Sequence, residues 1–562
     1  MSFKDLRALL AGLDDKKLLR RVQRPIDKDT ELMPLVRWQF RGQPESERKA
    51  WLFENVVDAQ GRRYCPVAVG VLGGSAAIYA TAFGAHPDEV QQRWAQAQLH
   101  PIPPVMVSSG PVKEVICRGP ELAEEGHGLE EFPHPISIPG FDSAPFITSP
   151  YVVTKDPDNG VINVGTYRGM LKGPNRCALK FHRRRHIGVH YEKARALGRP
   201  LEVAIVIGAA PVVGMVSVTT IPYGKSEYDV AGGLQQEPLE LVKCETVDLE
   251  VPAHAEIVLE GEIPPEYLEP EGPFGEFPGY MHGRQWMPVF HLKCITRRKD
   301  PIYQAFISQM SPSESSTLRK ISYRGVMFKF LKYDCNIYTV TDVALPESAA
   351  CGPLIVIQMK KSNPAQPWAA LQAASGYDSG LGKIFVVVDD DIDPHDPESV
   401  IWALSYRMQP ASDMKVITHR VAALDPSAAP AGTEDAEESE YPEPHGSSAV
   451  LIDATRKWAY MPVALPARPY MERARQIWEE LGYPPLRPRV PWFGYNLGAW
   501  NKEDKEAAEL AVRGQYRVTA AKHAAMARGK ASTDGSRPAE SVEAPGTSRR
   551  LKKPEVSQDP EE

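Results

Sequence analysis

Three apolar runs in the middle of the chain constrain its fold more strongly than any other feature. They cover residues 201–208, 254–263 and 288–298, and in each run apolar side chains alternate with polar ones. Turn-forming residues bound each run, and this combination is typical of antiparallel strands with one buried face. We therefore expect residues 121–310 to form a β-rich domain, either a sheet or a barrel.

The segments on either side of this region have a different pattern. Residues 1–120 combine an N-terminal amphipathic helix, for which Ser2 is the expected cap, with short apolar runs, and they predict an α/β module. Between residues 311 and 465, apolar runs at 354–359 and 383–389 alternate with helix-like segments. This alternation predicts a second α/β module.

The C-terminal part of the chain is more polar. Residues 466–528 predict two helices, over 469–481 and 503–528, whereas residues 529–562 lack apolar periodicity and are expected to be disordered. Within the second α/β module, residues 425–448 are rich in proline, alanine and serine and carry a cluster of acidic side chains. We expect a solvated acidic loop there, with an acidic interaction patch as the alternative.

Composition narrows the functional classes. The chain has 562 residues with 65 basic and 72 acidic side chains, and the formal charge of −7 argues against a general nucleic-acid binder. No apolar run approaches the ~18–20 residues that span a bilayer, and the N-terminus lacks the apolar core of a signal peptide. The seven cysteines form no CxxC pair. We expect a cytoplasmic protein with no nucleic-acid or membrane partner.

Common catalytic and nucleotide-binding motifs do not occur in the sequence. It contains no GxGxxG, HExxH or GxSxG, and the SGLGK segment at 379–383 lacks the first glycine and the Ser/Thr of a phosphate-binding loop. Asp389–Asp391 lie at the end of an apolar strand. Strand ends can host functional sites, but a polar strand end without a function is the simpler interpretation. Unusual polar residues are instead concentrated between residues 162 and 282, inside the β-rich region.

Two carboxylates in that region flank a Gly-Pro-Phe-Gly sequence. Glu271 and Glu276 lie on either side of it, and neither glycine nor proline suits a helix interior, so we expect a shaped loop that holds both side chains. Paired carboxylates serve acid–base catalysis when their environments differ. Arg168 is a candidate to keep one of them ionised. A structural salt bridge is the alternative interpretation.

Three further residues suggest a metal site. Asn163, His186 and Glu227 provide an amide, an imidazole and a carboxylate. A mixed nitrogen and oxygen set of this kind suits Mn²⁺ or Mg²⁺, with a phosphate or water completing the octahedron. A thiolate zinc site is not indicated.

Five segments, in their order and spacing, resemble the UbiD family of decarboxylases that use prenylated FMN. They are INVGTYRG (162–169), RHIG (185–188), SEYDVAGGL (226–234), VKCETVDLEVPAHAEIVLEG (242–261) and EGPFGExxGY (271–280). The resemblance extends from about residue 5 to about residue 500. It implies an N-terminal α/β module, a central split β-barrel that binds the flavin, and a C-terminal α/β domain with dimerising helices. The implied assembly is a homodimer or a homohexamer.

The resemblance also implies roles for individual residues. Asn163, His186 and Glu227 would bind a divalent metal, usually Mn²⁺, that bridges to the cofactor phosphate. A K⁺ site would use Ser217 and backbone oxygens of residues 216–220. The residues implied to contact prenylated FMN are Asn163, Thr166, Tyr167, Arg168, Arg185, His186, Glu227 and, by a looser match, Lys457. The implied catalytic network consists of Glu271, Arg168 and Glu276.

The implied reaction is the reversible decarboxylation of an aromatic, heteroaromatic or other α,β-unsaturated acid, free or as a CoA thioester. It would pass through a covalent adduct with prenylated FMN, Glu276 would donate the proton, and a flavin prenyltransferase would supply the cofactor. The alternatives are an aromatic carboxylase or carboxylase subunit that fixes CO₂, and a non-catalytic flavin-binding assembly protein. Substrate specificity is expected to come from residues 307–320 and from the strand at 354–359.

Overall fold

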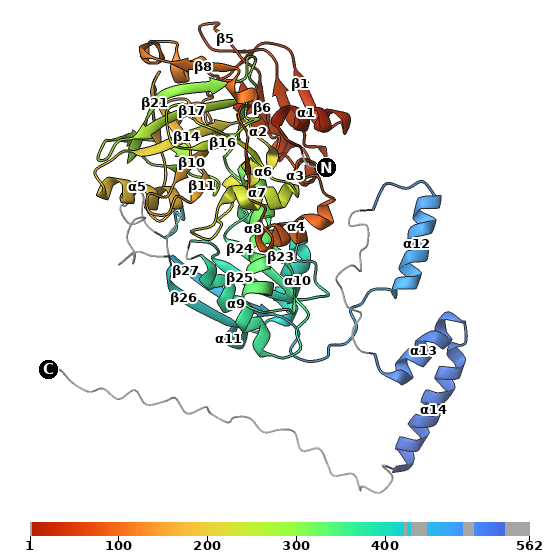
Figure 1. Cartoon of the computed structure of the whole chain (residues 1–562). Helices are drawn as coiled ribbons and strands as arrows, with labels where there is room; N and C mark the ends of the chain where they lie inside the picture. The colour runs from red at the N-terminus through yellow and green to blue at the C-terminus, as the bar shows by residue number, and fades with distance from the viewer. Residues whose placement is uncertain (1–2, 379, 421–423, 429–446, 487–499, 534–562) are drawn as a thin grey trace, which may run out of the picture. The chain divides into compact units, whose positions relative to one another are not determined.

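The computed structural model describes residues 3–378, 380–420, 424–428, 447–486 and 500–533 (Figure 1). The chain divides into two compact units. The first comprises Met1–Trp458 with Gln476–Tyr495, and the second comprises Ala459–Arg475 with Asn496–Glu562. Every candidate site residue predicted from the sequence lies in the first unit.

The N-terminal part of the first unit contains helix α1 and a four-stranded sheet. α1 (Leu6–Asp15) buries four leucines, and Asp5 caps it by accepting a hydrogen bond of 2.8 Å from the Ala8 backbone N–H. The predicted cap at Ser2 is therefore wrong, because the helix begins later. The sheet has the order β1 (Leu19–Val22), β3 (Ala50–Phe53), β6 (Val67–Val69) and β22 (Tyr303–Ala305).

Helices and short strands complete this part. β22 lies near the end of the predicted β-rich region, 121–310, yet it pairs with β6, so the N-terminal and central parts are joined through a shared sheet. The neighbouring helices are α2 (Leu32–Gly42), α3 (Ala76–Phe83) and α4 (Val90–Leu99). Two small sheets contain β2 (Ile26–Asp27), β4 (Val56–Val57) and β5 (Arg63–Tyr64), and β16 (Glu250–Pro252), β15 (Glu240–Lys243) and β7 (Val105–Met106).

A ten-stranded sheet forms the centre of the first unit. Its main path starts at β11 and ends at β9, and no pairing closes the two ends among the described residues, so the barrel stays a prediction. Two further strands, β8 (Val115–Arg118) and β18 (Leu268–Glu271), pair with β21. The main path is β11 (Ile162–Thr166), β10 (Tyr151–Lys155), β14 (Leu201–Ile207), β17 (Ile257–Ile263), β21 (Gln285–Arg297), β13 (Arg176–Leu179), β12 (Gly169–Gly173) and β9 (Phe146–Ile147).

The central strands are buried on both faces, whereas the sequence predicted one buried face. On β14, Ala204 and Val206 belong to one hydrophobic core, while Val203 and Ile205 belong to another. The helices α6 (Pro211–Ser217) and α7 (Glu227–Gln235) contribute to the first core, and α5 (His186–Ala196) contributes to the second. Because the sheet lies between two cores, β14 is apolar on both faces over residues 203–207.

The C-terminal part of the first unit is a five-stranded sheet. The predicted runs at 354–359 and 383–389 are found as β24 (Leu354–Met359) and β25 (Ile384–Asp389), which pair in parallel. Helices α9 (Ala365–Tyr377), α10 (Pro397–Arg407) and α11 (Pro410–Asp413) separate its strands. The order is β23 (Val340–Ala344), β24, β25, β27 (Ser447–Ala454) and β26 (Met414–Arg420).

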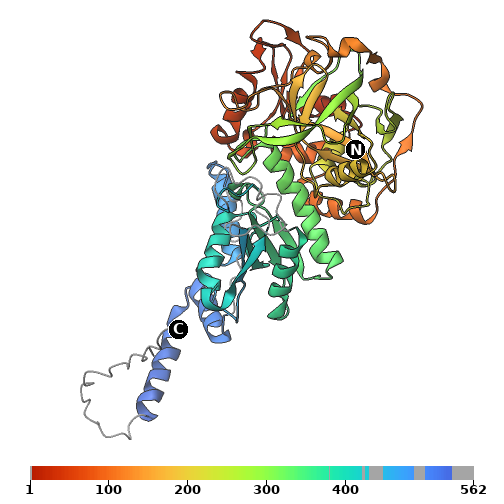
Figure 2. The ribbon, with the colours of Figure 1, turned by 90° about the vertical axis from the view of Figure 1, so that its left-hand side faces the viewer.

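A helix connects this sheet with the rest of the first unit, and an ion-pair cluster lies at the end of one of its strands. Helix α8 (Glu314–Lys329) packs against both α4 and β23, and Figure 2 shows it between the two parts of the unit. Asp389 and Asp391, at the end of β25, bind the buried Arg407 at 2.8 and 2.7 Å. These carboxylates are therefore structural, as the simpler interpretation proposed.

The late helices differ from the sequence prediction. α12 (Arg468–Glu480) matches the first predicted helix, but the predicted helix over 503–528 is divided into α13 (Lys502–Val512) and α14 (Tyr516–Thr533). Gly514 between them has φ +74°, a left-handed conformation that ends a helix. α14 also continues beyond residue 528, into the segment expected to be disordered.

Two predicted segments lie largely outside the described residues. Residues 429–446 contain most of the acidic loop, and residues 534–562 contain most of the tail. Among the described residues, no helix has the length and apolar character needed to cross a membrane.

The two buried faces of the central sheet lead to a test of the fold. Gly261 on β17 faces the backbone oxygen of His291, and a Cβ there would also lie 2.8 Å from the Phe290 ring. We expect Gly261→Ala to destabilise the protein by about 1–3 kcal/mol, because overpacking displaces backbone. A thermal unfolding scan should show a lower midpoint. The control is Gly376→Ala on α9, where a Cβ meets no atom within 4 Å; an unchanged midpoint for Gly261→Ala would contradict the register of β17 and β21.

Candidate active site

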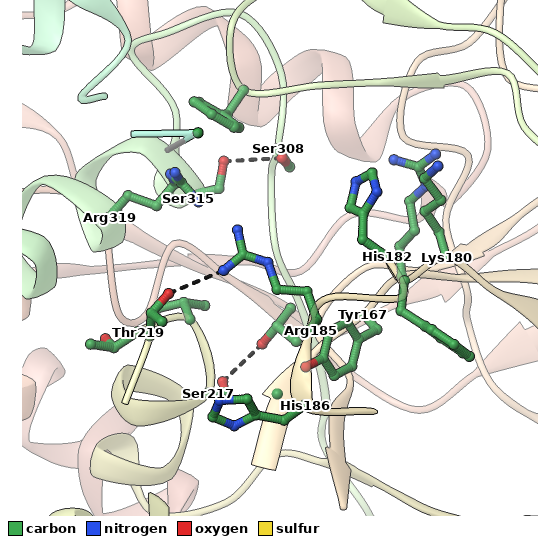
Figure 3. Close-up of a pocket in the computed structure, with 18 of the residues that line it drawn as sticks. Tyr167, Lys180, His182, Arg185, His186, Ser217, Thr219, Ser308, Ser315 and Arg319 are labelled. Atoms are coloured by element: carbon green, nitrogen blue, oxygen red, sulfur yellow. Dashed lines mark hydrogen bonds between the residues drawn. The ribbon is translucent and has the colours of Figure 1, made fainter. Parts of the chain in front are cut away.

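A cavity of about 380 Å³ lies between the central sheet and the C-terminal part of the first unit. Its volume is in the range of small-molecule sites. Several elements form its wall: β11 and the residues after it, the turn before α5, the end of α6, the start of α7, helix α8 and the loop that follows α9. Figure 3 shows side chains from these elements converging on the cavity.

Arg168 connects the two predicted carboxylates. Its Nε and Nη2 donate to the two carboxylate oxygens of Glu271 at 2.7 and 3.0 Å, and its Nη1 donates to Oε1 of Glu276. The guanidinium also lies over the Phe274 ring, 4.6 Å from its centroid. The structure therefore brings together the three residues that the sequence predicted as a network.

The loop that holds these carboxylates depends on its glycine and on a short hairpin. β18 ends at Glu271, and Gly272 then has φ +90°, which few other residues adopt. β19 (Phe274–Gly275) follows and pairs with β20 (Met281–His282), so Glu276 comes at the hairpin turn. Glu271 and Glu276 therefore lie on the same arm of the hairpin, on either side of residues 272–275, and both bind Arg168.

The two carboxylates differ in burial and in how many of their oxygens bind Arg168. The side chain of Glu271 is fully buried, and both of its oxygens accept from Arg168. Glu276 is 17% exposed, lines the cavity and binds Arg168 through one oxygen. Of the two, Glu276 is therefore the carboxylate that faces the cavity, and Glu271 is the one that fixes Arg168.

A third carboxyl group, which the sequence analysis missed, lies close to this network. Asp142 Oδ2 accepts a hydrogen bond of 2.7 Å from the Ile138 N–H, while Oδ1 is buried without a hydrogen-bond partner among the described residues. Burial raises the pKa of Asp142 to about 6, and the charge on Glu271 contributes while Arg168 opposes it. Nothing in the local sequence distinguishes this aspartate from a surface residue.

The predicted metal ligands also meet in the cavity. Asn163 lies on β11, His186 begins α5 and Glu227 begins α7. His186 Nδ1 is 3.6 Å from Glu227 Oε1, and the other oxygen of Glu227 accepts the Val164 N–H at 2.9 Å. Burial raises the pKa of Glu227. Among the described residues, no three His, Cys, Asp or Glu side chains form a metal cluster, so this set depends on the Asn163 amide.

The other predicted cofactor contacts line the same cavity. Thr166 Oγ1 and Ser217 Oγ are 2.8 Å apart, and Ser217 donates to the Gly214 carbonyl at 2.9 Å. Arg185 Nη1 donates to Thr220 Oγ1 at 3.2 Å, and the Tyr167 side chain lies nearby (Figure 3). Hydroxyls and an arginine thus lie beside the proposed metal ligands.

Lys457 is the exception among the predicted contacts. Its Nζ lies 2.9 Å from Asp453 and 3.4 Å from Asp413, and the residue is not part of the cavity wall. The position of Lys457 after β27 places its ammonium between these two carboxylates, which neutralise it. The contact of Lys457 with the cofactor therefore stays a prediction.

The cavity includes residues that the sequence did not assign to it. Asp378, Gly380 and Leu381, near the dismissed SGLGK segment, form part of its wall. The expected specificity segment 307–320 contributes Ser308, Ser315 and Arg319, whereas no residue of 354–359 lines the cavity. β24 is an inner strand of the C-terminal sheet, so its side chains pack within that part.

Comparison with known proteins identifies the family. Residues 105–311 match the family model described as the 3-octaprenyl-4-hydroxybenzoate carboxy-lyase Rift-related domain, and residues 316–454 match the corresponding C-terminal domain. An uncharacterized protein of Archaeoglobus fulgidus is 30% identical over 479 residues, which cover 82% of this chain and 93% of the relative.

The chain belongs to the UbiD family.

Two solved UbiD-class structures resemble this one. An evolved dimeric form of the enzyme HmfF from Pelotomaculum thermopropionicum, in complex with prenylated FMN, is 32% identical with a TM-score of 0.71; the match covers 84% of this chain and all of HmfF. Vanillic acid decarboxylase of Sedimentibacter hydroxybenzoicus is 27% identical with a TM-score of 0.71, covering 86% of this chain and 99% of that one. This UbiD-family chain is therefore a carboxy-lyase with the mixed α and β fold of these enzymes.

The raised pKa of Asp142 predicts a pH-dependent effect in this UbiD-family protein. Above pH 6 the folded state holds a desolvated carboxylate; as the pH falls from about 6 toward the usual 3.8, the folded state binds a proton that the unfolded chain does not, and stability increases. Asp142→Asn removes this cost. We expect the variant to exceed the wild type by about 1–2 kcal/mol at pH 7.5, with a smaller difference at pH 5. Denaturant unfolding at both pH values measures it, and a difference that grows toward pH 5 would contradict the assignment.

Proposed function

We propose that this chain is a reversible decarboxylase of an aromatic, heteroaromatic or other α,β-unsaturated carboxylic acid, and that it uses prenylated FMN. One observation carries the proposal. Arg168 joins Glu271 and Glu276 at the wall of the same cavity that holds Asn163, His186 and Glu227. A proton-donating group and a set of metal ligands thus face a single small-molecule site.

The residues of the cavity fit a phosphorylated flavin with a divalent metal. Asn163, His186 and Glu227 offer the nitrogen and oxygen donors that Mn²⁺ accepts, and the burial of Glu227 favours a bound cation that neutralises it. Arg185 lies in the same wall as a further cation for a phosphate. Ser217, with the backbone of residues 216–220, would hold K⁺. Prenylated FMN, when bound, supplies the electron sink that decarboxylation requires.

The chain's own residues would provide the proton and its control. Arg168 orients Glu276 through one hydrogen bond and is itself fixed by both oxygens of Glu271. Glu276 would carry a proton on its carboxyl group and transfer it to the carbon that has lost CO₂. The same carboxylate would accept that proton in the opposite direction, so the site also permits carboxylation at high CO₂. CoA thioesters remain within the proposed substrate range.

The proposal includes partners. A flavin prenyltransferase would supply the cofactor, and the late helices would assemble the chain as a homodimer or a homohexamer. HmfF was solved as an evolved dimer, and α12 carries exposed Tyr470 and Ile477 that suit an interface. We propose that the protein acts in the cytoplasm.

The direct test is co-expression with a flavin prenyltransferase, followed by incubation with a panel of aromatic, heteroaromatic and acrylic acids in D₂O. We expect CO₂ release from at least one acid and one deuterium at the carbon that carried the carboxylate. A fully loaded protein that releases CO₂ from no acid, and exchanges no CO₂ into any product, would favour the non-catalytic alternative.

Glu276→Gln tests the proton donor. The amide keeps the size of the side chain but cannot supply the proton, so we expect turnover to fall by at least about 100-fold while the flavin absorbance of the purified protein is retained. Glu269→Gln is the matched control: Glu269 lies on the same strand, β18, and binds Arg176 at 2.6 Å outside the cavity. Full activity of Glu276→Gln would remove Glu276 from the reaction.

Glu227→Gln tests the metal set. Loss of the negative charge should lower bound Mn²⁺, measured by elemental analysis, and should lower bound flavin with it, since both share this end of the cavity. Asp229→Asn, two residues along α7, is the control because Asp229 does not line the cavity. Unchanged metal and flavin in Glu227→Gln would show that Glu227 is not a ligand.

A further inference from the structure

Arg319 has an unusual environment for a cation inside the cavity. It projects from α8 and lies over two aromatic rings, with its guanidinium carbon 4.1 Å from the centroid of Phe277 and 5.0 Å from that of Tyr323. Within the part of the chain that the structure describes, its Nε is buried without a hydrogen-bond partner, and no carboxylate lies within ion-pairing distance.

Its neighbours on the same helix show the usual arrangement. Lys320 lies 3.9 Å from Glu45, and Arg324 binds Asp342 at 3.0 Å. Burying a charged group is costly unless an opposite charge or hydrogen bonds compensate it, and aromatic rings compensate it only in part. Arg319 is half-buried and lines the cavity, so an anionic ligand bound there would supply the opposite charge that its guanidinium lacks among the described residues.

The position of Arg319 indicates which ligand would supply the anion. Phe277, on which it stacks, directly follows Glu276, so Arg319 belongs to the proton-transfer end of the cavity. Figure 3 shows Arg185 between Arg319 and His186, the proposed metal ligand. A cofactor phosphate bound at His186 would thus have Arg185 nearer to it than Arg319.

Two hydroxyls lie on the same side of the cavity. Ser315 is one turn before Arg319 on α8, and its Oγ donates to Ser308 Oγ at 3.0 Å; both residues line the cavity (Figure 3). We call Arg319, Ser308 and Ser315 the distal subsite. A guanidinium and hydroxyls together are suited to bind a carboxylate.

The reacting carboxylate is a poor candidate for this subsite. That group loses its charge when CO₂ leaves, so a strong ion pair with it would stabilise the bound acid more than the transition state and would slow the reaction. A second anionic group, which keeps its charge throughout, could bind Arg319 in the substrate, the transition state and the product alike. Such binding would orient the ring or chain without opposing the loss of CO₂.

We propose that the distal subsite binds a second carboxylate of the substrate, so that the preferred substrates are dicarboxylic acids. This rests on the proposed function for the reaction itself, but the binding of the second carboxylate can be measured without turnover. Arg319 is then the residue that selects a dianionic acid over a monoanionic acid of the same shape.

The test compares acids that differ in charge but not in size. The 1,3- and 1,4-benzenedicarboxylates are titrated calorimetrically into the full chain loaded with FMN, which leaves the acids intact, and their monoamides are titrated in parallel. We expect the preferred dicarboxylate to bind at least about 10-fold more tightly than its monoamide. Arg319→Met should lower dicarboxylate affinity about 10-fold and monoamide affinity less than about 2-fold.

Two variants separate binding from structure. Lys320→Met removes the same charge from the same helix outside the cavity, and it should leave both affinities unchanged. Arg319→Lys retains a charge but not the planar stack, and it should keep part of the preference, which also covers the case in which Arg319→Met does not fold.

Three results would overturn the proposal: equal affinity of the wild type for dicarboxylates and monoamides, an equal loss for both in Arg319→Met, or loss of bound FMN in that variant. An equal loss would mean that Arg319 only positions Phe277, and loss of FMN would make it a cofactor residue. The proposed function fails separately. A preference for dicarboxylates without CO₂ release from any acid refutes the decarboxylase, whereas CO₂ release from monocarboxylates without that preference refutes only the distal subsite.

Discussion

The hydrogen-bonded ion pair between Arg168 and Glu271 is the interaction on which the candidate site depends. It joins residues 103 positions apart, through two hydrogen bonds, in a place where the Glu271 side chain is fully buried. The Coulomb attraction within a buried ion pair offsets the free-energy cost of removing both charges from water only when both partners are well hydrogen-bonded. Glu271 provides that geometry, and Arg168 is then fixed well enough to orient Glu276, the proposed proton donor.

The fold holds Glu271 on a paired strand of the sheet and places Glu276 on a short hairpin that reaches the cavity. β18 pairs with β21, a long strand of the central sheet that also pairs with β17, β13 and β8, so Glu271 is attached to a strand held by several neighbours. Glu276 lies beyond it on a short hairpin that reaches the cavity. The proposed metal ligands come from β11 and from the first residues of α5 and α7, which pack on opposite faces of the same sheet. One rigid sheet therefore sets the distance between the two ends of the cavity.

Local patterns in the sequence predicted those parts of the structure that depend on local chemistry. The Gly-Pro-Phe-Gly sequence excluded a regular helix between Glu271 and Glu276, and the apolar runs located β14, β17, β24 and β25. The burial of both sheet faces was missed because Glu202 and Glu262 made the runs look half polar. The division at Gly514 could have been predicted, since a glycine with flanking polar residues is a common helix end. The predicted catalytic residues came from a family resemblance, and residue spacing alone left a structural salt bridge open.

The sequence could not predict the roles of side chains whose partners are distant along the chain. Lys457 resembles a phosphate ligand until Asp413 and Asp453 are seen to neutralise it. Asp142 and Arg319 look like surface charges, yet Asp142 has a buried carboxylate oxygen close to Arg168 and Glu271, and Arg319 lies in the cavity wall. In each case the deciding fact is which opposite charge is near, and that depends on long-range packing.

The central claim is that one cavity holds the cofactor between the metal ligands and Glu276. A crystal structure of the protein loaded with prenylated FMN and Mn²⁺, with anomalous diffraction recorded at the manganese edge, tests it most directly. The account predicts an anomalous peak bound by Asn163, His186 and Glu227, with the flavin ring extending from it toward Glu276. A manganese peak away from these three residues, or a flavin whose ring lies out of reach of Glu276, would contradict it.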